Sequence, residues 1–413
     1  MSSWAPRHSG RPGSPVRGAP GAGTLGAHFE GRTPDLPTMR STALPASSLA
    51  RKWGPALASS VLRESLHVQP GENVTVEAWS SCAEWARYVV SQARRLGAHP
   101  LWLYEDEQEF WETAADPARS TTDSLGRHEV GALRHTDVYV FFYGPSEWPR
   151  EIRLGTDTPA RRATSNLEWL ARAERAGIRG VRLWLGRASR LAAEFWNADL
   201  RVWQNELVQG SLVPPREMRR TGRSLARRLE RGHRLTIRNP DGSQLELRLK
   251  GYRSLLLDGA YHAGDVRAGA FMVTLPSGVV EVCVDESYAE GTFVCDTPSH
   301  PNQLTIRGGR WTFHRGRLVD FTLDSGIDEF RRQLGRAGRD AARPALFSIG
   351  LNPRIRLAPQ MTYLKRGAIV CQIGGNRYFG GSNASPFSSW LVASHADVDL
   401  DGHLLVRRGV PLG

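Results

Sequence analysis

The sequence predicts two structural classes in one chain: an α/β N-terminal domain with an open, mostly parallel sheet, and a β-rich α+β C-terminal domain. Before about residue 235, strand patterns alternate with helix patterns, which is typical of a parallel sheet covered by helices. Beyond that point, short strands with alternating polar and apolar side chains follow one another with glycine turns between them. The 413 residues suffice for two domains, each with its own core.

The expected domains are an extension rich in Gly, Pro and Arg (1–48), the α/β domain (49–235) and the β-rich domain (236–413). The extension lacks apolar periodicity, which predicts disorder. Met39 stands shortly before the first helical pattern, so Met1 and Met39 are both candidate start residues. No apolar segment follows a basic start, and no stretch reaches the roughly 18 apolar residues of a membrane span. We therefore expect a cytoplasmic protein with no membrane partner.

Helix and strand patterns alternate in the first half. Residues 73–78 alternate as a strand does, and Ser80 or Ser81 begins a helix that Gly97 ends. With the strand that follows, these elements form a βαβ unit, which places the two strands parallel. The predicted elements of this half are helices over 50–66, 166–176 and 216–231 and strands over 73–78, 99–104, 137–143 and 180–185. No GxGxxG motif follows the first strand, so no dinucleotide site is predicted.

Short strands dominate the second half. Turns at Asp241-Gly242, Gly308-Gly309 and Arg315-Gly316 separate them. The predicted strands cover 234–237, 244–249, 269–275, 279–284, 302–306, 310–314 and 317–323, and one helix over 327–334 interrupts them. Residues 236–413 are therefore expected to form a β-rich α+β domain.

Positive charge concentrates on the predicted helix over 216–231. The chain has a formal net charge of +12, and residues 216–238 hold nine arginines against only Glu217 and Glu230. Five of these arginines recur at intervals of three or four and so share one helix face: Arg216, Arg220, Arg223, Arg227 and Arg231. A solvated face usually carries both signs of charge, whereas a surface that follows a phosphate backbone carries one. These arginines are the candidate nucleic-acid-binding residues.

Six short motifs resemble, in order, those of the M29 family of aminopeptidases (aminopeptidase T/S type). The motifs lie at residues 70–74 (PGENV), 240–245 (PDGSQL), 275–278 (LPSG), 348–353 (SIGLNP), 379–385 (FGGSNAS) and 401–409 (a DG pair followed by a glycine). The resemblance implies an aminopeptidase-like fold, a homodimer and a pocket in which glutamates, histidines and an aspartate hold two metal ions.

The metal-binding side chains of that family are replaced in this sequence. The family's ligand positions fall on Val279, Leu346, Val370, Ser388 and Trp390. Valine, leucine and tryptophan offer no lone pair to a divalent cation, and a two-metal site needs several oxygen or nitrogen ligands held close together. We therefore expect no metal and no other cofactor.

Polar residues remain in the pocket that the resemblance implies. The candidate catalytic residues are Tyr378, Ser388, Glu281 and Ser348, and the candidate substrate-binding residues are Asn383, Ser385, Gly380 and Gly381. Their hydroxyl and carboxyl groups could orient a substrate or relay protons. The alternative is that these side chains only fill the pocket and have no role in function.

A relocated metal site is a further alternative. His395, Asp397 and Asp399 alternate along one predicted strand and could share a face, as could Asp401 and His403 beyond them. An exposed edge strand beside the Asp401-Gly402 turn is the favoured interpretation of this pattern.

The basic helix and the lost ligands together resemble aminoacyl-tRNA-dependent transferases of hydroxylamine-derived natural-product pathways. That resemblance implies transfer of an aminoacyl group from aminoacyl-tRNA to a small hydroxylamine or amine acceptor, a reaction that needs no metal-bound water. Two alternatives stay open: an aminopeptidase-like metallohydrolase with displaced ligands, and a non-catalytic binding protein.

Overall fold

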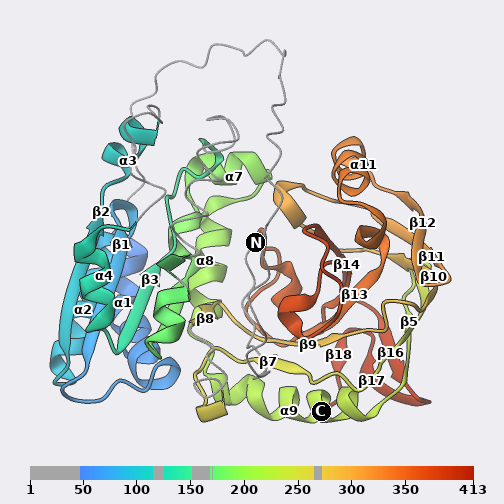
Figure 1. Cartoon of the computed structure of the whole chain (residues 1–413), viewed down its shortest axis with the longest axis horizontal. Helices are drawn as coiled ribbons and strands as arrows, with labels where there is room; N and C mark the ends of the chain where they lie inside the picture. Colours follow the sequence, from blue (N-terminus) through green and yellow to red (C-terminus); the bar gives the residue numbers. More distant parts are fainter. Residues whose placement is uncertain (1–46, 115–124, 151–167, 170, 265–271) are drawn as a thin grey trace, which may run out of the picture.

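The computed structural model describes residues 47–114, 125–150, 168–169, 171–264 and 272–413. Most of the predicted extension, 1–46, lies outside these residues, as does part of the predicted helix over 166–176. Figure 1 shows two halves side by side: a parallel sheet with its helices, and a compact assembly of antiparallel sheets. None of the helices in the described part of the chain is long and apolar enough to cross a lipid bilayer.

A five-stranded parallel sheet organises the first half, as the sequence predicts. Its strands, in spatial order, are β2 (His99–Glu105), β1 (Asn73–Trp79), β3 (Val138–Phe142), β4 (Arg179–Leu183) and β8 (Met272–Leu275). The helices of this half are α1 (Ser47–Ser60), the π-helical turn η1 (Val61–Ser65), α2 (Ala83–Arg95), α3 (Glu107–Ala114), α4 (Arg127–Arg134), α7 (Arg190–Trp196) and α8 (Leu200–Ser211). Buried apolar residues of β1, β3 and β4 pack against α1 and α2, which fixes the sheet in place.

Two antiparallel sheets pack face to face in the second half. The larger has the order β12 (Arg317–Thr322), β11 (Arg310–His314), β10 (Ala289–Val294), β6 (Gln244–Arg248), β5 (Arg234–Arg238), β16 (Asp397–Leu400), β17 (His403–Arg407) and β18 (Val410–Pro411). The smaller has the order β15 (Ser388–Ala393), β14 (Ile369–Gly374), β13 (Pro344–Gly350), β9 (Val279–Cys283) and β7 (Leu255–Leu257). One apolar core lies between them, and α11 (Ile327–Arg336) packs at its rim.

The long basic helix α9 (Pro215–Arg231) links the two halves. It runs beneath the antiparallel half in Figure 1, and the end of the chain lies against it, with Gly413 close to Thr221. Its apolar side packs on the smaller antiparallel sheet, where Gly222 contacts Leu256 and Met218 approaches Gly278. These contacts place α9 next to β7 and β9.

Two predicted strands take other places than expected. Of the strand predicted over 269–275, residues 269–271 lie outside the described residues and the rest forms β8, which pairs in parallel with β4, so the first half's sheet is completed from beyond residue 235. Residues 302–306 form no strand: Pro301–Gln303 is a 3-10 turn in which Asn302 has φ 48°, and Ile306 makes a single isolated bridge. Pro301 has no backbone N–H to donate to a ladder, which explains the turn at this point.

Candidate functional site

The positions to which the resemblance assigns metal ligands share one face of the smaller antiparallel sheet. Ser348 on β13 pairs with Glu281 on β9 and with Val370 on β14, while Trp390 on β15 pairs with Gln372. Directly paired residues point to the same side of a sheet, and side chains alternate along each strand. Val279, Leu346, Val370, Ser388 and Trp390 therefore all lie on the face turned away from the core between the two sheets.

Apolar contacts occupy this face at several of the positions to which the resemblance assigns metal ligands. Val279 is fully buried and belongs to a cluster with Trp148 and Trp184 of the first half and Met361 of the second. Val370 and Trp390 are buried in a smaller cluster against which Tyr363 packs. These side chains carry no oxygen or imidazole donor, so the residues present do not fit a two-metal centre.

No alternative metal site forms in the part of the chain that the structure describes. No three His, Cys, Asp or Glu side chains there gather closely enough to hold an ion. The predicted group at β16 is spread out: His395 binds Asp296 at 3.0 Å, Asp397 accepts the amide of Arg408, and the Asp399 carboxylate accepts the amide of Gly402 at 2.7 Å. These carboxylates hold turns and loops.

Glu281 and Ser348 form the polar centre of the face. The Ser348 hydroxyl donates to the Glu281 carboxylate across 3.5 Å, and Ser348 itself is buried. Burial raises the pKa of Glu281 to about 7, against which the Ser348 hydrogen bond acts to lower it. A carboxyl group with a pKa near neutrality is suited to take up and release a proton.

Tyr363 and Arg182 lie within electrostatic range of this centre, on the side of the first half. Neither is among the candidate site residues predicted from the sequence. Burial raises the pKa of Tyr363, and the charge of Glu281 raises it further, whereas Arg182 lowers it. Arg182 lies on β4, and its guanidinium stands 5.2 Å from the centroid of the Tyr143 ring. An arginine between two buried residues of a parallel strand, Val181 and Leu183, is the sequence signal that could have identified it.

The loop after β14 holds the remaining predicted residues in its own hydrogen-bond network. Glu286 accepts bonds from the amides of Ser382 and Asn383 and from the Asn376 side chain. Asn383 also donates to the Asp340 carbonyl and accepts the Ser385 amide, each within 2.9 Å. The loop therefore supplies Asn383 and Ser385 with structural partners.

The other predicted pocket residues border the same loop. Tyr378 is 68% exposed, and a side chain at Gly381 would collide with Asn376. Gly380 is the left-handed residue (φ 90°) that ends the 3-10 turn containing Tyr378. Ser388 opens β15, and its carbonyl accepts a bond from Asn302. None of these four has a direct hydrogen bond to Glu281 or Ser348 among the described contacts, so their catalytic or binding roles stay predictions.

The predicted arginine face of α9 is exposed. All five of its arginines lie at the surface: Arg216, Arg220, Arg223, Arg227 and Arg231. The residues on the opposite side of the helix are buried: Met218, Gly222, Leu225 and Leu229. Other arginines of residues 216–238 form ion pairs or hydrogen bonds within the protein. Arg219 binds Asp258 at 2.7 Å, Arg228 donates to the Leu404 carbonyl, and Arg234 binds Glu246. No described acidic side chain forms a salt bridge with any of the five.

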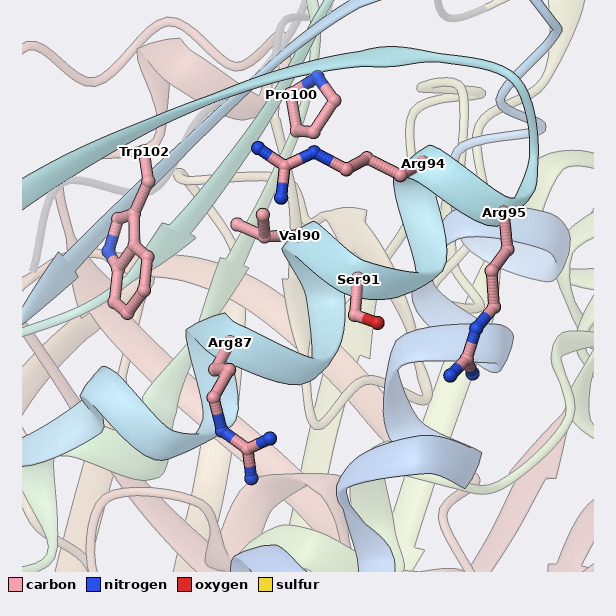
Figure 2. Close-up of a pocket in the computed structure, with 7 residues that line it drawn as sticks. All are labelled: Arg87, Val90, Ser91, Arg94, Arg95, Pro100 and Trp102. Atoms are coloured by element: carbon pink, nitrogen blue, oxygen red, sulfur yellow. The ribbon is translucent and has the colours of Figure 1, made fainter.

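Two surface hollows are lined by arginine. One, of about 360 Å³, lies at the end of α9 between Arg227, Arg231 and His403. The other, of about 430 Å³, lies between α2 and β2; Figure 2 shows the Arg94 guanidinium beside Pro100, on the side where Trp102 lies. Guanidinium groups beside an exposed tryptophan are a combination that single-stranded nucleic acids recognise.

Comparison with known proteins shows similarity at the level of structure. No protein-family model matches the chain, and no curated protein matches it. Wild-type AmpT from Thermus thermophilus superposes with a TM-score of 0.66, with 19% identity, covering 88% of this chain and 100% of AmpT. The chain has an aminopeptidase-like fold. A 2,5-dihydroxypyridine dioxygenase from Pseudomonas putida KT2440 also superposes, with a TM-score of 0.57 and 16% identity over 87% of this chain and 97% of its own.

The aminopeptidase-like fold confirms the predicted fold class, an α/β half joined to a β-rich half. At identities this low, structural similarity concerns the fold alone. The residues on the face of Glu281 must therefore support any statement about activity.

Proposed function

We propose that this protein is a metal-independent transferase that moves an aminoacyl group from aminoacyl-tRNA to a small hydroxylamine or amine acceptor. The observation that carries the proposal is the exposed arginine face of α9, whose five guanidinium groups have no described counter-ion. A row of unpaired positive charges on one helix is suited to the phosphate backbone of a nucleic acid.

The chemistry of the Glu281 face agrees with such a reaction. The ester of aminoacyl-tRNA is already activated, so an amine can attack its carbonyl without a metal-bound water. The new C–N bond forms, the C–O bond to the ribose breaks, and a proton passes from the amine to the ribose oxygen. Glu281, with a pKa of about 7, would carry that proton, and the protein otherwise has to orient the two reactants.

A substrate that used both features would have to extend from the exposed side of α9 to the opposite face of the smaller antiparallel sheet. Met218 and Gly222 of α9 pack on the core side of that sheet, whereas Glu281 lies on its other side. A tRNA offers phosphates to the helix and an aminoacyl group to the pocket. An uncharged peptide would use the pocket and leave the arginines without a role.

Retention of deacylated tRNA across a salt series tests the proposal. Five phosphate contacts predict a slope of log affinity against log salt of about −4 to −5. The triple variant R220Q/R223Q/R227Q should bind more weakly, with a slope shallower by about 3. The matched control R331Q/R332Q/R336Q removes as many exposed arginines from α11 and should leave the slope unchanged. Equal losses in both variants, or no retention at moderate salt, would overturn the proposal.

A further inference from the structure

The surface hollow between helix α2 and strand β2 combines positive charge with an aromatic ring. Its volume of about 430 Å³ lies within the range of roughly 300–1,000 Å³ that is typical of small-ligand sites. No acidic residue is among the described residues that line it: Arg87, Val90, Ser91, Arg94, Arg95, Pro100 and Trp102. The hollow is therefore suited to an anion.

The positive charge of the hollow is only partly neutralised within the fold. Arg87 lies 3.9 Å from Glu84, at the edge of salt-bridge range. Arg94 and Arg95 are exposed in the last turn of α2 and form no salt bridge with any described residue. Cations near the C-terminus of a helix interact favourably with its dipole, which leaves their guanidinium groups free to contact an anion in solution.

Trp102 places an aromatic face beside this charge. Its side chain is 37% exposed on β2, the edge strand of the parallel sheet, where only β1 pairs with it among the described strands. Figure 2 shows the Arg94 guanidinium beside Pro100, on the side of α2 where Trp102 lies. An exposed indole next to a guanidinium group offers a surface on which a planar ring can stack.

We propose that this hollow binds one unpaired nucleotide of a single-stranded RNA segment. The base stacks on the Trp102 ring, and the guanidinium groups of Arg94 and Arg95 contact the adjoining phosphates. In taking RNA as the source of the nucleotide, the inference rests on the proposed function. An unpaired loop of the tRNA would be held here, apart from the arginine face of α9.

Other anionic partners match only part of the hollow. A duplex offers phosphates, but its bases are stacked on one another and do not reach Trp102. An acidic lipid headgroup would use the arginines and leave the indole without a role. A free nucleotide would use both, but Arg94, Arg95 and Trp102 are all exposed, which suits a strand that continues past the hollow better than an enclosed small molecule.

Binding of a fluorescent hexauridylate to the full chain, measured by anisotropy, tests this inference. An abasic hexamer of the same length and charge separates stacking from phosphate contact. We expect hexauridylate to bind about fivefold or more tightly than the abasic hexamer. Equal affinities would overturn the inference, because the indole would then contribute nothing. Competition by free uridine monophosphate as strong as that by unlabelled hexauridylate would also overturn it.

Replacement of Trp102 should affect only the oligomer that has bases. W102L should weaken hexauridylate about tenfold and leave the abasic hexamer unchanged. The control L101A changes an exposed residue on the opposite face of the same strand and should leave both affinities unchanged. W102F keeps a ring, should retain most of the affinity, and serves if W102L does not fold. Equal losses for both oligomers in W102L would contradict stacking.

Replacement of the two arginines should affect both oligomers. R94Q/R95Q should weaken hexauridylate and the abasic hexamer alike, with a salt slope for hexauridylate that is shallower by about 1.4, or about 0.7 for each single-strand phosphate. The matched control R331Q/R336Q removes two exposed arginines from α11 and should leave the slope unchanged. An unchanged slope in R94Q/R95Q would overturn the inference.

Two further measurements separate this inference from its alternatives. If R94Q/R95Q abolishes binding to phosphatidylserine vesicles while hexauridylate does not bind the wild-type chain, the hollow is a lipid site and the inference is wrong. Hexauridylate binding that W102L weakens, without retention of tRNA, would support the hollow and remove the transferase proposal. Retention of tRNA that depends on the α9 arginines, with no effect of W102L on hexauridylate, would do the opposite.

Discussion

Glu281 changes charge within the physiological pH range, because burial raises its pKa to about 7 from the 4.5 of an exposed glutamate. The folded chain therefore holds this proton more tightly than the unfolded chain between those two pH values. By linkage, the free energy of unfolding falls as pH rises through that window. The ionised carboxylate then costs the folded state up to about 3 kcal/mol at pH 8.

The variant E281Q should accordingly be more stable than wild type at pH 8. We expect an increase in the free energy of unfolding of about 1–3 kcal/mol at pH 8 and little change at pH 4, where the carboxyl group is protonated in both states. Urea denaturation at the two pH values measures the difference. The control E109Q removes an exposed glutamate and should show no such increase; a destabilised E281Q at pH 8 would contradict the assignment of Glu281 as an unpaired buried acid.

Ser348 should tune the pH at which Glu281 acts. Its hydroxyl donates to the carboxylate and so lowers the pKa that burial raises. In S348A that pKa should rise, and the rate of transfer should reach half of its maximum at a higher pH than in wild type. A pH–rate profile of both proteins measures the shift. An unchanged midpoint with a lowered maximum would show that Ser348 acts in some other way.

Side chains that meet across the two halves could not be predicted from sequence. The alternation of side chains along a strand places Val279 and Glu281 on one face, and motif order relates Ser348 to them. Arg182 lies well before β9 in the sequence and Tyr363 well after it, and only the contact between the two halves brings them within electrostatic range of one another. Single-sequence patterns carry no information on such contacts.

Helix α9 carries two kinds of arginine: some form ion pairs or hydrogen bonds within the fold, and others are exposed without a described salt bridge. Arg219 pairs with Asp258, a carboxylate that is only 1% exposed and that also binds His262. The exposed arginines repel one another along the helix at intervals of three and four. Their replacement and the replacement of Arg219 should therefore change stability in opposite directions.

We expect R220Q/R223Q/R227Q to melt at the same temperature as wild type or higher, and R219M to melt lower. Loss of the Arg219 partner leaves a buried carboxylate with only His262 and the Ala260 amide among its described partners, and such losses cost about 3 kcal/mol. Thermal unfolding at low salt compares the variants. If the triple variant is the less stable one, the exposed arginines hold the fold together and their role in binding tRNA becomes doubtful.

Helices and strands with a regular polar and apolar period can be predicted from the sequence. Strands that are recognised only by their neighbours in a sheet cannot. The long helix over 216–231 agrees closely with α9 because arginines and apolar residues follow a helical period. The short strands β13, β14 and β15 were not predicted as strands, because both of their faces are apolar or nearly so and give no alternation.

In the whole molecule, the halves meet at the face on which the resemblance to the aminopeptidase family places metal ligands. Val279 lies in a cluster with Trp148 and Trp203 of the first half and Met361 of the second. The position to which the resemblance assigns a metal ligand is therefore part of the packing between the halves. Fold class follows from the order of strand and helix patterns, but this contact follows only from the three-dimensional arrangement.

Truncation of Val279 should weaken that contact. V279A removes two buried methyl groups and should lower the free energy of unfolding by about 2 kcal/mol. V319A, at a position that is 59% exposed, should change it by less than about 0.5 kcal/mol. Chemical denaturation measures both, with and without added Zn²⁺ or Mn²⁺. A metal-dependent stabilisation of the wild-type chain that E281Q abolishes would show that the residues on this face bind metal after all.

The most direct test of the account is transfer from tRNA in the presence of a chelator. The protein is treated with EDTA and mixed with tRNA that carries a radiolabelled aminoacyl group and with an amine or amino-acid acceptor. The account predicts that label moves from tRNA to the acceptor at the same rate with and without EDTA, and that R220Q/R223Q/R227Q slows the transfer. Release of label, or cleavage of a peptide, only after a divalent metal is restored would contradict it and indicate a metallohydrolase.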